Sequence, residues 1–92
     1  MLKTKLTKSE LSILRVLIFA EDFSLILSET GLNSGAVRDD LIKLINHGYI
    51  EVYDDHGGYK RVPSAFYDSD HIDQFRFKAT KLGLKSIQHH AI

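Results

Sequence analysis

Polar and cationic side chains suited to recognising another molecule gather in the stretch NSGAVRDDLIK. Asn33, Ser34, Gly35 and Arg38 fall in its first half, and Lys43 ends it. A guanidinium can form two parallel hydrogen bonds with a guanine base or with a phosphate, so Arg38 is a candidate contact to nucleic acid. Lys43 lies further along and can touch a phosphate backbone. The chemistry that these residue types offer is therefore binding rather than bond making.

A second group of candidate contacts, Tyr59, Lys60 and Arg61, comes directly after the glycine pair Gly57-Gly58. The glycines favour a turn, so the two cations would stand just past the tip of a hairpin. There they can meet phosphates, while the tyrosine ring can lie against a sugar or a groove wall. Exposed strands often carry cations with no binding role, and that simpler interpretation stays open.

No catalytic set emerges from the sequence. None of the serines lies in the nucleophile-elbow pattern, and Gly57-Gly58 is too short to cradle a phosphate. His89 and His90 are adjacent, so on a helix they point in different directions, and no histidine pair has the His-x3-His spacing of a zinc site. We therefore expect neither an enzyme nor a metal site, and no cofactor.

The composition is that of a small globular protein. The 92 residues suffice for one domain, 1–92, and hydrophobic residues make up 43% of them. The absence of cysteine rules out disulfides and thiolate metal sites, which fits a reducing compartment. The longest apolar-rich stretch, 11–20, is too short to span a bilayer, and the first residues lack the apolar run of a signal peptide. We therefore expect a cytoplasmic protein without membrane contact.

Charge is balanced overall but uneven along the chain. The formal net charge is zero, which is evidence against a strong nonspecific nucleic-acid binder. Residues 1–15 carry four basic side chains and one acidic side chain, and residues 60–92 carry six basic and three acidic side chains. Residues 16–59 carry two basic side chains and eight acids. Basic ends around an acidic middle can still give a neutral protein a local positive face.

The first helix is predicted from a capping box. Thr7 and Glu10 stand three residues apart, so each side chain can bond the backbone N–H of the other residue. Apolar residues at helical spacing follow, and the helix is expected to run to about Ala20, buried on two sides, with Ile18 and Phe19 included. A connector at 21–23 would then lead to the second helix.

Two further helices are predicted around a tight turn. The first covers 24–30 and can end at Gly31, which tolerates positive φ. The second, over about 34–47, is capped by Asn33 or Ser34 and ended by a glycine. Its inward side would be formed by Val37, Leu41, Leu44 and Ile45.

Strands and a last helix are predicted in the second half. The stretches 49–53 and 59–62 are expected to form a hairpin around the turn cluster 54–58. A loop over 63–70 separates this hairpin from a second alternating stretch, 72–79. Thereafter a helix is expected that is capped by Thr80 and ends at about His90. Its apolar side would be formed by Leu82, Leu84 and Ile87. The predicted class is α+β: a three-helix core, a β-hairpin wing and a C-terminal helix.

The run from Ile26 to Glu51, ILSETGLNSGAVRDDLIKLINHGYIE, resembles the helix-turn-helix of the MarR, PadR and ArsR-like winged-helix transcriptional regulators. It has a glycine and an apolar residue in the turn, a polar residue and a valine at the start of the next helix, and two leucines three residues apart. The segment FKATKLG, from Phe77 to Gly83, looks like a last wing strand that runs into a threonine-capped helix. The resemblance implies a helix over about 34–47 that enters the major groove and a wing that contacts DNA.

Asp39 and Asp40 depart from the pattern of those regulators, which commonly place a basic or neutral polar residue at one or both positions. Aspartates near a helix start are most simply solvated acids that complement the helix dipole. They can also accept a hydrogen bond from cytosine, and they repel nearby phosphates. Arg38 has its own simpler interpretation, a salt bridge to one of these aspartates or to an acid of the preceding helix.

We therefore expect a small transcriptional regulator that binds double-stranded DNA in a sequence-specific way, as a homodimer formed through the C-terminal helix. The alternative is a winged helix that serves as a protein–protein adaptor in transcription or replication, of viral or mobile-element origin. Zero net charge and the acids on the groove helix favour this alternative.

Overall fold

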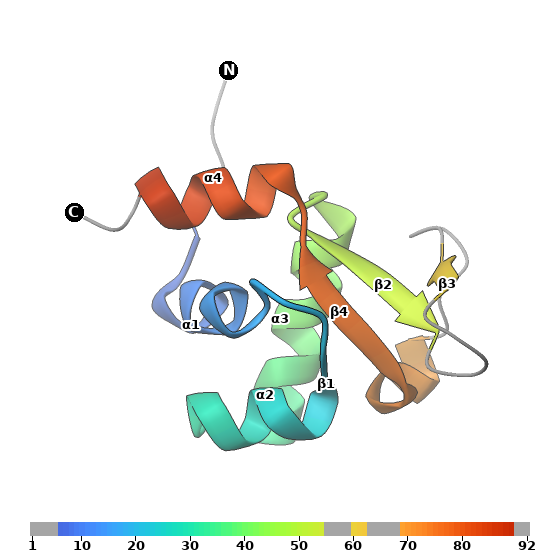
Figure 1. Cartoon of the computed structure of the whole chain (residues 1–92). Helices are drawn as coiled ribbons and strands as arrows, with labels where there is room; N and C mark the ends of the chain where they lie inside the picture. The colour runs from blue at the N-terminus through green and yellow to red at the C-terminus, as the bar shows by residue number, and fades with distance from the viewer. Residues whose placement is uncertain (1–5, 55–59, 63–68, 90–92) are drawn as a thin grey trace.

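The structure is a computed structural model that describes residues 6–54, 60–62 and 69–89 of the chain. These residues form an α+β domain in which three helices and a fourth, C-terminal helix surround one side of an antiparallel sheet (Figure 1). The elements are α1 (Lys8–Val16), β1 (Glu21–Asp22), α2 (Phe23–Thr30), α3 (Ser34–Asn46), β2 (Ile50–Asp54), β3 (Lys60–Val62), the 3-10 segment η1 (Ser69–Gln74), β4 (Phe75–Ala79) and α4 (Lys81–His89).

The predicted start of α1 is confirmed, and its predicted end is wrong. The Thr7 hydroxyl accepts from the Glu10 N–H, and the Glu10 carboxylate accepts from the Thr7 N–H, which completes the capping box. The helix ends at Val16 instead of Ala20, because the chain turns away to meet the sheet. The Ala79 N–H donates to the Leu17 carbonyl at 2.7 Å.

The early end of α1 leaves two apolar side chains outside the core. Ile18 is 43% exposed and Phe19 is 72% exposed, although both were expected to be buried. The predicted connector at 21–23 also has more structure than expected. Its first two residues form β1, which pairs with β4, and Phe23 begins α2 one residue before the predicted start.

The turn between α2 and α3 has the predicted form. Gly31 ends α2 with φ of 70°, a left-handed conformation that favours glycine. Asn33, rather than Ser34, caps α3 by accepting a hydrogen bond from the Ala36 N–H at 2.8 Å. The four apolar residues predicted to face inward, Val37, Leu41, Leu44 and Ile45, are all buried.

The sheet has the strand order β1-β4-β2-β3, and every pairing is antiparallel. The predicted hairpin is confirmed for its described strands, since β2 pairs with β3 through Val52 opposite Val62. Its turn at 55–59 and most of the predicted loop, 63–68, lie outside the described residues. The strand β4 lies between β1 and β2, so the last strand of the chain is a central one (Figure 1).

The alternating stretch 72–79 is a strand only from Phe75 onwards. The residues before it coil into η1, which carries Ile72 into the core at 3% exposure. A single buried residue between exposed ones satisfies the alternation that predicts a strand, and a 3-10 turn presents the same pattern. The prediction of a strand over 72–74 is therefore wrong, and η1 is an additional element.

The helix α4 starts as predicted at the Thr80 cap. The Thr80 hydroxyl accepts from the Gly83 N–H at 3.2 Å and donates to the Gly48 carbonyl at 2.7 Å. Leu84 and Ile87 are partly buried against the core. Leu82 was expected on this apolar side, but it is 48% exposed.

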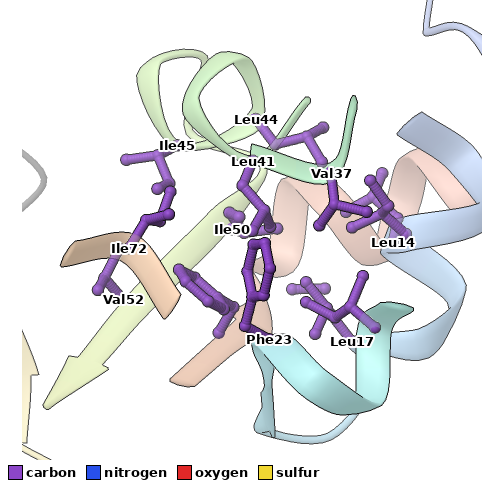
Figure 2. Close-up of a cluster of buried hydrophobic side chains, with 14 residues drawn as sticks. Leu14, Leu17, Phe23, Val37, Leu41, Leu44, Ile45, Ile50, Val52 and Ile72 are labelled. Atoms are coloured by element: carbon purple, nitrogen blue, oxygen red, sulfur yellow. The ribbon is translucent and has the colours of Figure 1, made fainter. Parts of the chain in front are cut away.

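The core is one cluster to which the helices and the sheet all contribute. Figure 2 shows Phe23 of α2 between Leu17, which follows α1, and Ile50 of β2, with the buried side chains of α3 above them. Ile72 of η1 closes the side near Val52 and Ile45. Because α3 contributes four buried side chains, its orientation is fixed by its inner face. In the described part of the chain, no helix is both long and apolar enough to cross a membrane.

Candidate nucleic-acid interface

The outer face of α3 is exposed along the length of the helix. At about 100° per residue, the buried stripe centred on Val37 and Leu41 lies opposite a line through Gly35, Asp39 and Asn46. All three residues of that line are exposed. A straight helix with one buried face and one open face can be offered to a partner without disturbing the core.

The two cations of α3 stand on opposite flanks of this outer face. They are five residues apart, which places them roughly 140° apart around the helix axis. Arg38 faces η1, where its Nη2 lies 3.8 Å from Oδ1 of Asp70. Lys43 faces α1, where it borders a hollow together with Thr7 and Glu10. The structure therefore does not join the two cations into one positive patch.

The polar residues at the start of α3 have distinct local roles. Asn33 holds the helix cap with its side-chain oxygen, so that oxygen is already engaged in the fold. Ser34 and Gly35 are exposed in the first turn. Both border a hollow of about 260 Å³ that separates the start of α3 from η1. Residues placed there can approach a partner from the N-terminal end of the helix.

Asp70 is the ion-pair partner of Arg38, and the sequence did not predict it. The expected partners were neighbouring aspartates of α3 or an acid of α2. The side chains of Arg38 and Asp70 are 47% and 84% exposed. Such an exposed pair contributes little to stability, since water screens the charges. It nevertheless places a carboxylate beside the guanidinium.

The two aspartates of α3 occupy different environments, which corrects the expectation that both are exposed. Asp39 is exposed near the middle of the outer face. Asp40 is half-buried towards α1, and its Oδ2 accepts a hydrogen bond from the Ser9 hydroxyl at 2.6 Å. Both residues lie beyond the first turn of α3, which begins at Ser34. The helix dipole, whose effect fades within the first turn, therefore stabilises them less than expected.

The second candidate group belongs to the edge strand β3. The backbones of Lys60 and Arg61 pair with Asp54 and Tyr53 of β2. Tyr59 and the side chains of Lys60 and Arg61 lie outside the described residues. The structure thus gives the backbones of these two residues a place on the hairpin.

Two acids of η1 border the candidate interface and were missed at the sequence level. Asp70 and Asp73 line the hollow opposite Ser34 and Gly35, with Ile72 and Phe23 at its base. The sequence did contain a signal: Asp70 and Asp73 are three residues apart with Ile72 between them. One turn of helix would place the two acids on the same side. An alternating strand fits the same residues, so the pattern alone could not choose.

Among residues 6–54, 60–62 and 69–89, no three histidine or carboxylate side chains gather where they could hold a metal ion. Comparison with protein-family models, with curated proteins and with solved structures gave no match. Function is therefore inferred from the geometry of the interface itself.

Proposed function

We propose that this chain is a winged helix-turn-helix protein that binds double-stranded DNA as a small transcriptional regulator. The observation that carries this proposal is the open outer face of α3, held from behind by four buried apolar side chains. A helix of 13 residues is about 20 Å long, a size that the major groove accepts. The left-handed turn at Gly31 and the β2–β3 hairpin support the same architecture.

In this proposal the N-terminal end of α3 reads bases and the flanks meet phosphates. Asn33, Ser34 and Gly35 face the base edges, and Arg38 reaches a guanine or a phosphate. Lys43 contacts the backbone on the other flank. The β2–β3 hairpin acts as the wing and presents Tyr59, Lys60 and Arg61 to the DNA.

The position of Asp40 lowers the electrostatic cost of this arrangement. Because that carboxylate is half-buried and held by Ser9, only Asp39 projects from the middle of the outer face. If four cations contact phosphates, the logarithm of the affinity falls against the logarithm of salt concentration with a slope of about −3.6.

The direct test is a titration of labelled random-sequence duplex at low and at moderate salt, read by fluorescence anisotropy. Binding at low salt that weakens with salt is expected. Arg38→Ala should weaken it about 5- to 20-fold, whereas the matched cation change Lys85→Ala on α4 should weaken it less than about twofold. Absence of binding at low salt would overturn the DNA proposal, and equal effects of the two variants would contradict the placement of α3 in the groove.

A protein–protein adaptor is the second candidate, and one observation favours it. Asp39 on the outer face and Asp70 and Asp73 on its flank form an acidic border around Arg38. A basic partner surface would complement such a border. In that case duplex DNA does not bind at low salt, and Asp39→Ala does not restore binding.

We further propose a homodimer through α4. Leu82 is exposed on its first turn, and Ile18 and Phe19 are exposed just after Leu17, whose carbonyl accepts from the Ala79 N–H. Exposed large apolar side chains are typical of contact surfaces. A two-fold dimer would let two α3 helices reach successive major grooves.

A further inference from the structure

We propose that η1 attenuates DNA binding, with the Asp70 carboxylate competing against DNA phosphates for the Arg38 guanidinium. This inference rests on the proposed DNA-binding function. It concerns how strongly the interface binds, and it assigns a role to an element that lies outside the helix-turn-helix.

The position of η1 beside α3 is fixed by the core. Ile72 is buried among side chains of α2, α3 and β2, as Figure 2 shows for Ile45 and Val52. The two acids on either side of it, Asp70 and Asp73, are exposed and border the hollow at the start of α3. Because a buried anchor holds the segment, the acids stay beside the interface.

The ion pair places a negative charge where a phosphate would otherwise bind. The 3.8 Å distance from Nη2 of Arg38 to Oδ1 of Asp70 leaves the guanidinium facing the flank rather than the middle of the outer face. Arg38 is the one cation in the first two turns of α3, residues 34–41. An arriving phosphate competes with Asp70 for Arg38, and it also meets the repulsion of Asp70 and Asp73. Both effects lower the affinity for DNA.

Removal of the Asp70 charge is therefore expected to tighten DNA binding. Asp70→Asn keeps the shape of the side chain, and the exposure of this residue makes a loss of folding unexpected. We expect duplex binding about two- to fivefold tighter at low salt, as the release of an exposed ion pair allows. The gain should shrink as salt rises, because salt screens the competing carboxylate and the phosphates alike.

A double-mutant cycle separates the ion pair from general repulsion. The proteins are wild type, Asp70→Asn, Arg38→Gln and the double variant, all titrated with the same duplex. Asp73→Asn is the matched control, since it removes the same charge from the same segment and the same hollow. We expect the gain from Asp70→Asn to exceed that from Asp73→Asn, and to fall to the control level when Arg38 is absent. Circular dichroism and thermal unfolding confirm that each variant is folded.

Each outcome decides the inference. A wild-type protein that binds DNA, with no tighter binding by Asp70→Asn, overturns attenuation and leaves the proposed function intact. Weaker binding by Asp70→Asn also overturns it, because Asp70 would then orient Arg38 for contact. Failure of the wild-type protein to bind at low salt overturns the function and the inference together.

Discussion

Asp39 and Asp40 are neighbours in sequence with different structural roles. One step along a helix turns the side chain by about 100°, which is enough to move from the middle of the outer face to the edge of the core. Asp40 joins α3 to α1 through the Ser9 hydroxyl, while Asp39 faces outwards. Asp40 thus helps to hold two helices together, whereas Asp39 contributes only to the exposed surface.

The two aspartates are expected to give opposite results when each is replaced by alanine. Asp40→Ala removes a charged hydrogen bond in a half-buried place and should lower the free energy of unfolding by about 1 to 2 kcal/mol. Asp39→Ala should change it by less than about 0.5 kcal/mol. In DNA titrations the order reverses: Asp39→Ala binds about two- to fivefold tighter, because a carboxylate has left the groove-facing surface. Urea unfolding and fluorescence anisotropy measure the two quantities.

Ser9→Ala is the control for the structural half of that prediction. It should reproduce most of the loss caused by Asp40→Ala, and the two losses should not add in the double variant. Additive losses would show that the Ser9–Asp40 contact does not link the helices. Tighter DNA binding by Asp40→Ala with no change from Asp39→Ala would contradict the assignment of the outer face.

At the level of elements, α4 is held against the end of α3 by its first turn. The Tyr49 carbonyl accepts from the Thr80 N–H at 2.9 Å, and the Thr80 hydroxyl donates to the neighbouring Gly48 carbonyl. Gly83 is buried against the same segment, and a Cβ there would overlap the Tyr49 carbonyl oxygen. The helix therefore approaches the backbone as closely as a residue without a side chain permits.

Glycine-to-alanine substitutions at two helices should have opposite effects on stability. Alanine normally favours a helix over glycine, and Gly35 of α3 has room, since a Cβ meets only the Asn33 side-chain oxygen at 3.4 Å. Gly35→Ala should raise the free energy of unfolding by about 0.5 kcal/mol. Gly83→Ala should lower it by about 1 to 3 kcal/mol, because α4 has to move away from Tyr49. Stabilisation by both variants in urea unfolding would contradict the close approach.

The starts of three helices could be predicted from the sequence, and the end of α1 could not. Thr7, Asn33 and Thr80 cap helices through residues three positions on, so the signal is local. The end of α1 depends on a hydrogen bond from Ala79, far along the chain, and no local pattern contains it. Propensity favoured continuing the helix, and tertiary pairing with the sheet prevailed.

In the candidate site, too, the features set by local sequence could be predicted, and those set by packing between distant elements could not. The inner face of α3 follows from helical periodicity, so its outer face follows as well. Asp70, the ion-pair partner of Arg38, could not be predicted, because η1 is placed by the burial of Ile72 in a core that several elements build. Burial of Asp40 depends in the same way on where α1 crosses α3.

At the scale of the whole molecule, the exposed apolar side chains predict self-association. If Leu82 lies in a two-fold interface, each substitution acts twice, once from each copy. Leu82→Glu should therefore raise the dissociation constant of the dimer about 10- to 100-fold, since a charge is buried without a partner. Sedimentation velocity over a concentration series measures this constant.

Gln88→Glu is the matched control, because it adds the same charge to another exposed position of α4. It should leave the dimer within about threefold of the wild type. A wild-type protein that stays monomeric at all concentrations, or equal effects of the two variants, would contradict the proposed dimer surface.

The position of β4 in the sheet also has a consequence for how the protein is made. Its place between β1 and β2 is filled by a strand that leaves the ribosome after β1, β2 and β3. Until then the two flanking strands have no common neighbour, and the Leu17 carbonyl lacks the Ala79 N–H that it bonds in the finished fold. Before β4 is made, the nascent chain can form the three helices and the β2–β3 hairpin but not the complete sheet. A stall before residue 79 would therefore leave unpaired strand edges that other chains could pair with.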